Sequence, residues 1–133
     1  MISFTVYGIP QPKGSTRSFV KDGKVITTSD NPRLKDWHHL VAWAAQEHKP
    51  PALMQGPVMV TLMFTLARPK SVSPKKRPLP VVKPDLDKLI RAVLDALKGT
   101  FYADDGQVCA LNVFKRYGDE PGVWVCVDEC IAG

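Results

Sequence analysis

The segment from Pro84 to Lys98 constrains the fold more than any other part of the chain. Its apolar residues recur every three or four positions, which is the spacing of one face of an amphipathic helix. These residues are Leu86, Leu89, Ile90, Val93, Leu94 and Leu97. Pro84 fits just ahead of a helix start, Asp85 is a good N-cap, and Asp87 falls in the first turn. The sequence therefore predicts a helix over residues 85–98.

Alternation of apolar and polar residues predicts the strands around this helix. Four segments alternate in this way: 2–7, 57–66, 108–117 and 123–127. The second is expected to be a central strand that is half-buried on one face. The last is expected to run antiparallel to its neighbour and to close a hairpin across the turn at 118–122. A separate hairpin is predicted where Asp22-Gly23 stands between two β-prone runs, 18–20 and 25–27.

A first helix is expected between Asn31 and Lys49. Asn31 is a good N-cap, Pro32 suits the first helical position, and the prolines after Lys49 cannot continue a helix. The order of elements contains no internal repeat and no linker between two cores. We therefore predict a single α+β domain over residues 1–133, with a mixed or mostly antiparallel sheet and two main helices on one side.

The segment ahead of the second helix carries a concentrated positive charge. Between Ala67 and Pro84 there are six basic residues and no acidic one. The basic residues are Arg68, Lys70, Lys75, Lys76, Arg77 and Lys83. Prolines make this segment an extended loop rather than a helix. Together with a net charge of +5, the loop favours a polyanionic partner; the alternative is a solvated loop that keeps the protein soluble.

Two pairs of carboxylates flank the second helix. Asp85 and Asp87 lie at its start, and Asp104-Asp105 follow a turn rich in glycine and aromatic residues after its end. Three or four carboxylates that converge make an oxygen-rich site suited to Mg²⁺ or Mn²⁺. Each pair also has a purely structural explanation, because Asp caps helices and Asp-Asp-Gly is an ordinary turn.

The sequence gives no sign of membrane association or secretion. No apolar run approaches the roughly 20 residues that a membrane span needs. The N-terminal residues alternate like a strand, so we do not expect a signal peptide. The three cysteines contain no Cys-x-x-Cys pair, which argues against a disulfide framework or a zinc ribbon. A reduced, cytoplasmic setting is expected.

Three motifs stand in order along this half of the chain. They are Asp85-Leu86-Asp87-Lys88, Leu94-Asp95-Ala96-Leu97 and Asp104-Asp105-Gly106-Gln107-Val108, and they follow the basic loop. This arrangement resembles the RusA family of Holliday junction resolvases, in which Asn is commoner than Lys after the second aspartate. The resemblance implies a crossover junction endodeoxyribonuclease of a bacterial host, often encoded by a phage or prophage. It also implies a homodimer that cuts two opposed strands of a four-way DNA junction.

The resemblance also implies roles for individual residues. Asp85, Asp87 and Asp105 match the metal-binding aspartates, with Mg²⁺ or alternatively Mn²⁺ as the ion. Arg91 stands where the family usually has Lys; it keeps a phosphate contact but cannot donate a proton, because guanidinium does not deprotonate. Contacts to the DNA backbone are expected from basic residues of the loops and of the helix start. These residues are Lys13, Arg17, Lys75, Lys76, Arg77, Lys83 and Lys88.

Two other acids are expected to be structural: Asp104 as a turn residue and Asp95 as the partner of Arg91, one helical turn away. Two rival functions remain open. One is a DNA-binding module without catalysis, in which the acidic residues only cap a helix, and Mg²⁺-dependent nicking of a junction discriminates against it. The other is a metal-dependent hydrolase of free nucleotides, which would act on a small substrate with little dependence on DNA branching.

Overall fold

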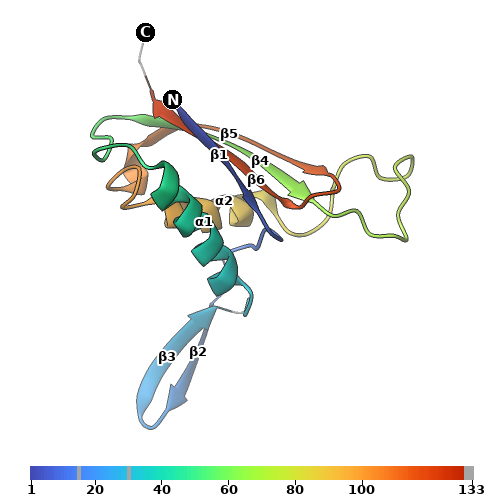
Figure 1. Ribbon diagram of the computed structural model, residues 1–133. Helices are drawn as coiled ribbons and strands as arrows, with labels where there is room; N and C mark the ends of the chain where they lie inside the picture. Colours follow the sequence, from blue (N-terminus) through green and yellow to red (C-terminus); the bar gives the residue numbers. More distant parts are fainter. Residues whose placement is uncertain (15, 30, 131–133) are drawn as a thin grey trace.

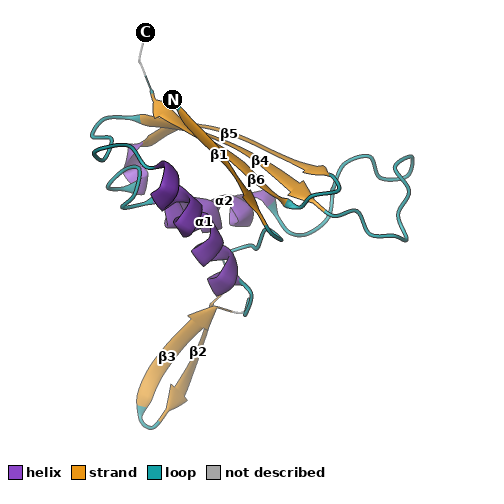
Figure 2. Cartoon of the chain, viewed as in Figure 1, coloured by secondary structure: helices purple, strands orange, loops and turns teal. Residues whose placement is uncertain are grey.

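The structure is a computed structural model that describes residues 1–14, 16–29 and 31–130, with only the backbone of residues 16, 17 and 27–29. The elements, in chain order, are β1 (Ile2–Tyr7), β2 (Thr16–Lys21), β3 (Lys24–Ser29), α1 (Leu34–His48), β4 (Val58–Leu66), α2 (Leu86–Leu97), the short 3-10 helix η1 (Asp105–Gln107), β5 (Val108–Tyr117) and β6 (Gly122–Glu129). Both helices lie on one face of a four-stranded sheet, as Figures 1 and 2 show. No helix in the described part of the chain is long and apolar enough to cross a membrane.

The sheet is mixed, with the strand order β1-β6-β4-β5. β4 pairs in parallel with β5 and antiparallel with β6. A parallel pair of strands needs a long crossover connection, and the connection between β4 and β5 contains α2. The expected α+β class, with a mixed sheet and two main helices, is confirmed.

The expected closing hairpin is wrong. β5 and β6 run in opposite directions, but β4 lies between them in the sheet. The connecting turn passes over the end of β4, where the backbone N–H of Gly118 donates to the carbonyl of Leu66 at 3.0 Å. A short turn between two alternating segments therefore does not guarantee that they pair with each other.

Alternation along β4 sets the position of the core. Every second residue of this strand is buried and the residues between are partly exposed, which confirms the predicted half-burial. The buried residues are Val58, Val60, Leu62, Phe64 and Leu66. All of these except Leu66 share one apolar cluster with Leu89, Val93 and Leu97 of α2. Since burial of each such side chain contributes roughly 1.5–3 kcal/mol, α2 is fixed against the sheet along its length.

The predicted helix boundaries are confirmed except at the start of α1. α2 begins at Leu86, with Asp85 as an N-cap in extended conformation. α1 begins at Leu34 rather than Pro32. Asn31 forms a turn ahead of the helix, because its Oδ1 accepts from the backbone N–H of Arg33 at 3.1 Å and its carbonyl accepts from that of Leu34 at 3.2 Å.

The hairpin at Asp22-Gly23 is confirmed. β2 and β3 pair antiparallel, and both turn residues have positive φ, 52° for Asp22 and 75° for Gly23. Positive φ at both positions is the requirement of a type I′ turn, which suits the twist of a two-stranded ribbon. β2 and β3 contact chiefly each other, and the hairpin extends away from the helices and the sheet (Figure 1).

Candidate functional site

The candidate site begins at the N-terminus of α2. This end of the helix lies at the edge of the sheet where the parallel strands β4 and β5 both end (Figure 1). Ligands of sheets with parallel strands bind in the crevice beyond the carboxyl ends of those strands. The Asp85 side chain makes no capping hydrogen bond, although Asp85 is the N-cap. Its carboxylate is about half exposed and lies 4.0 Å from Nζ of Lys88, so capping does not explain this residue.

Asp87 and Arg91 occupy one exposed face of α2, one turn apart. Among the residues that the structure describes, neither side chain has a hydrogen bond or an ion pair. A carboxylate and a guanidinium that the fold leaves uncommitted are available to an external ligand. Their spacing suits a ligand that carries both a cation and an anionic group.

Asp105 opens η1 and lies beside Tyr102. The Tyr102 hydroxyl donates to the carbonyl of Leu94 on α2 at 3.2 Å. Burial raises the pKa of Tyr102 above its ordinary value, and the nearby carboxylates of Asp105 and Asp95 raise it further. Tyr102 therefore links the Asp105 carboxylate to the last turns of α2.

The three aspartates expected to bind metal come from two elements. Asp85 and Asp87 stand at the start of α2, whereas Asp105 opens η1 and lies beside Tyr102, whose hydroxyl donates to the carbonyl of Leu94. Within the described ranges, no three His, Cys, Asp or Glu side chains form a group that could hold a metal ion. Asp85 and Asp87 are nevertheless hard oxygen donors, and such a pair fits Mg²⁺, which usually keeps several waters. The shared metal-binding role of the three aspartates stays a prediction.

The expected pairing of Asp95 with Arg91 is wrong. Oδ2 of Asp95 lies 2.8 Å from Nζ of Lys13 and 3.7 Å from Nδ1 of His38. Lys13 reaches it because the loop ahead of β2 is attached to α2, through a hydrogen bond from the Lys13 backbone N–H to the carbonyl of Lys88 at 2.9 Å. Lys13 is therefore held beside α2, with its charge shared with Asp95.

Lys115 is a residue of the site that sequence reasoning missed. Its Nζ donates to the carbonyls of Val82 and Pro84, each at 2.9 Å. These carbonyls belong to the segment that leads directly into Asp85. Lys115 pairs with Phe64 in the sheet register and lies on the helix-covered face. The sequence could have indicated this role, because Lys115 occupies a position of β5 that shares a face with apolar residues of the strand.

Gln107 is a second residue whose role was missed. Its Oε1 accepts from the backbone N–H groups of Ala103 and Asp104, at 2.8 and 3.0 Å. Its Nε2 donates to the carbonyls of Met54 and Gly56, at 2.7 and 3.0 Å. One side chain thus ties the turn that carries Asp104 and Asp105 to the segment ahead of β4. The signal was its fixed place two residues after the acidic pair.

Comparison with known proteins decides the family. The profile of the family described as Endodeoxyribonuclease RusA matches residues 9–128. The chain belongs to the RusA family. It is also 37% identical to the uncharacterized protein YqaN of Bacillus subtilis (strain 168), over 140 aligned positions that cover 98% of each chain. Membership indicates an endodeoxyribonuclease that binds branched DNA, in a family of nucleases that generally depend on divalent metal.

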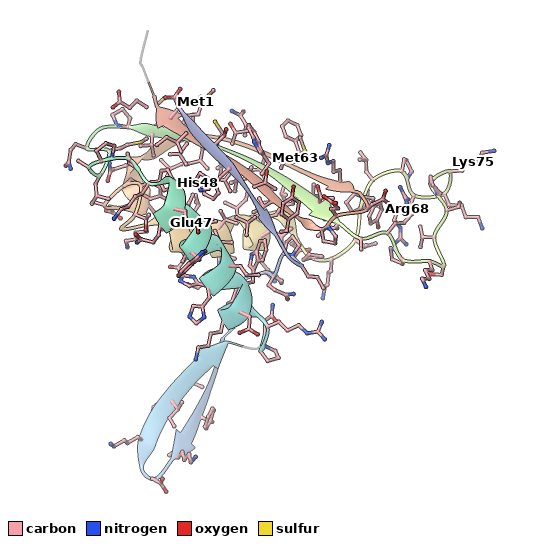
Figure 3. All side chains as sticks on the ribbon, viewed as in Figure 1. Met1, Glu47, His48, Met63, Arg68 and Lys75 are labelled. Carbon is pink, nitrogen blue, oxygen red and sulfur yellow. The ribbon has the colours of Figure 1, made fainter. Side chains whose placement is uncertain are left out.

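The basic loop of this RusA-family chain extends away from the sheet (Figure 2), and it forms neither helix nor strand, as expected. Figure 3 shows Lys75 at its outer end and Arg68 near its base. The Arg68 guanidinium lies 4.4 Å from the centre of the Tyr117 ring and donates to the carbonyl of Arg77. The base of the loop is therefore fixed, while its outer lysines are free to meet a polyanion.

The other cations expected to bind DNA come from the basic loop, the start of α2 and the hairpin. Lys76 and Lys83 are exposed, and Arg77 and Lys88 are partly exposed. The side chain of Arg17 lies outside the described residues, although its backbone belongs to β2. The basic loop and the start of α2 thus present cations beside the carboxylates, and contact of these cations with DNA stays a prediction.

Proposed function

We propose that this RusA-family chain resolves Holliday junctions by Mg²⁺-dependent hydrolysis of phosphodiester bonds in two opposed strands. It acts as a homodimer of single-domain subunits in the cytoplasm of a bacterial host, encoded by a phage or prophage. The observation that carries the proposal is the start of α2. There, carboxylates that are not used for capping lie at the edge where parallel strands end, directly after a loop of cations.

Each residue of the site has a proposed task. Asp85, Asp87 and Asp105 would hold Mg²⁺ or Mn²⁺, which when bound lowers the pKa of a water and stabilises the negative charge that develops on the phosphate. Arg91 supports the scissile phosphate as a permanently charged donor and exchanges no proton. Tyr102 positions Asp105 against α2.

The cations around the site are proposed to bind the DNA arms through phosphate contacts, which give affinity without sequence preference. They are Lys13, Arg17, Lys75, Lys76, Arg77, Lys83 and Lys88. They also offset the repulsion between DNA and the uncompensated carboxylates of the site. Of these cations, Lys13 contributes less, because Asp95 shares its charge.

The test is cleavage of a synthetic four-way junction beside a linear duplex of the same arm sequence, in Mg²⁺, in Mn²⁺ and in EDTA. We expect paired nicks in opposed strands of the junction with either metal, and none in EDTA or in the duplex. The Asp87→Asn variant, prepared in the same way, controls for a contaminating nuclease. Junction binding without cleavage in any metal would favour the non-catalytic DNA-binding module, and equal cutting of the linear duplex would remove structure specificity.

A further inference from the structure

The hairpin β2–β3 exposes apolar side chains on both of its faces. Phe19 and Ile26 are directly opposite each other and 43% and 36% exposed; the next pair, Val20 and Val25, is 70% and 73% exposed. Successive cross-strand pairs point to opposite faces of a ribbon. A two-stranded ribbon is marginally stable in water without a surface to pack on. The exposed apolar side chains therefore indicate that the hairpin packs against another surface when the protein functions.

The hairpin tip holds two lysines, Lys21 and Lys24, and one acid, Asp22 in the turn between them, so one positive charge is left over. The two lysines are directly opposite each other in the register and both are exposed. Like charges directly opposite across a strand pair destabilise it. An acidic surface that meets the tip would remove this repulsion.

An apolar hollow with an acidic rim lies at the far end of β1. It measures about 660 Å³ and is lined by Tyr7, Gly8, Ile9, Asp119, Glu120 and Pro121; we call it the acidic hollow. Tyr7 and Ile9 are each 63% exposed. In the described part of the chain, neither Asp119 nor Glu120 has an ion pair. Its two adjacent carboxylates are opposite in charge to the lysines of the hairpin tip, and its exposed apolar side chains suit the apolar residues beside that tip.

We propose that two copies of this chain exchange hairpins, with the tip of each seated in the acidic hollow of the other. Lys21 and Lys24 then face Asp119 and Glu120, and the valines beside the tip cover the exposed Tyr7 and Ile9. The contact is made twice about a two-fold axis, which doubles the apolar area that is buried and leaves no arm free. DNA suits the ribbon less well, because four apolar residues flank the tip and DNA contacts come mainly from cationic and polar side chains.

The inference specifies how the proposed homodimer assembles, and its test does not depend on nuclease activity. The measurement is the mass of the full chain by sedimentation equilibrium over a range of concentrations. Two variants reverse the charges: Lys21→Glu/Lys24→Glu at the tip and Asp119→Lys/Glu120→Lys at the hollow. We expect a dimeric wild type and, for each variant alone, a dimer dissociation constant raised by about 100-fold or more, because like charges juxtaposed across an interface are costly.

The decisive sample is the equimolar mixture of the two variants, in which every reversed tip can find a reversed hollow. The mixture, and a single chain with all four substitutions, are expected to recover dimers. The matched control is Lys75→Glu/Lys76→Glu, which makes the same charge change on the basic loop and should leave the dimer intact. Far-ultraviolet circular dichroism confirms that each variant is folded.

Three outcomes overturn the proposal. They are a monomeric wild type, a tip reversal that leaves the dimer constant unchanged, and two dissociating variants whose mixture stays monomeric. If the tip reversal leaves the mass unchanged but weakens junction binding, the hairpin binds DNA instead of a second copy.

Discussion

The start of α2 and the basic loop at residues 68–84 lie side by side in the chain and are built in opposite ways. α2 buries Leu89, Val93 and Leu97 completely, and Lys115 fastens the segment that leads into it. The loop is fixed near its base, and its outer lysines are exposed. Reacting groups must be held to a fraction of an ångström, whereas phosphate contacts act through charge and tolerate variation in position. We therefore expect α2 to control the cleavage rate and the loop to control affinity.

The largest expected effect is the loss of a single carboxylate of the proposed metal site. Asp85→Asn, Asp87→Asn and Asp105→Asn should each lower the cleavage rate by about 1,000-fold or more, because a metal ligand contributes several kcal/mol to charge stabilisation. Junction affinity should be unchanged or tighter, since a negative charge near phosphates is removed. Single-turnover cleavage in Mg²⁺ and binding in Ca²⁺ measure the two effects. Near wild-type cleavage by any one variant would exclude that residue from the metal site.

The second expected effect is a loss of junction affinity, without a loss of cleavage, when cations of the loop are removed. Lys75→Ala/Lys76→Ala/Arg77→Ala should weaken junction binding by roughly tenfold or more at moderate salt. It should also flatten the log–log salt dependence by about two to three, because each lost phosphate contact releases about one counterion fewer. Cleavage at saturating protein should be unchanged.

A salt titration with labelled junction in Ca²⁺ decides the point. Lys49→Ala removes an exposed cation at the end of α1, away from the loop and from the carboxylates, and serves as the control. If the triple variant keeps the wild-type slope, the loop is a solubilising surface and the division of labour between α2 and the loop is wrong.

The local parts of this comparison could be predicted from the sequence. Pro84, Asp85 and the apolar spacing that follows specify where α2 begins, and Asp22-Gly23 specifies the hairpin turn, because these signals act within a few residues. The loop was predictable for the same reason, since its prolines and cations determine its character without help from the rest of the chain.

The remaining errors concern residues that are distant in the sequence. Alternation in β5 is the same whether the strand pairs with β6 or with β4, so the strand order could not be read from it. Asp95 pairs with Lys13 because a backbone hydrogen bond attaches the preceding loop to α2, which no local pattern encodes. The motif order also leaves open whether Asp87 and Asp105 meet at one metal, which stays a prediction.

A smaller effect is expected where the two regions meet. Lys115→Met removes both hydrogen bonds to the segment ahead of Asp85 while keeping the length of the side chain. Cleavage should fall by about tenfold, as is typical when a partner that orients a metal ligand is lost, and junction affinity should change by less than about twofold. Arg116→Met is the matched control, because Arg116 is adjacent on β5 but points to the opposite face.

The same two variants also test whether Lys115 acts on DNA affinity. Lys115 is a cation beside the basic loop, so it could bind DNA phosphates instead of holding the segment ahead of Asp85 in position. If Lys115→Met flattens the salt dependence and leaves the saturated cleavage rate unchanged, Lys115 belongs functionally with the loop, and α2 is less firmly positioned than its packing suggests.

The smallest expected effect separates two adjacent acids. Asp104 is the N-cap of η1, a position that Asn fills about as well as Asp. Gln107 accepts from the backbone N–H of residue 104, and in the capping box the side chain of residue 104 faces the backbone N–H of Gln107, a place that the amide oxygen of Asn can take. Asp104→Asn should therefore change cleavage by less than about threefold, beside the near-complete loss expected for Asp105→Asn. Rates measured side by side in Mg²⁺ test this. Equal losses would mean that both carboxylates take part in the chemistry, and that the turn held by Gln107 adopts another conformation when DNA and metal are bound.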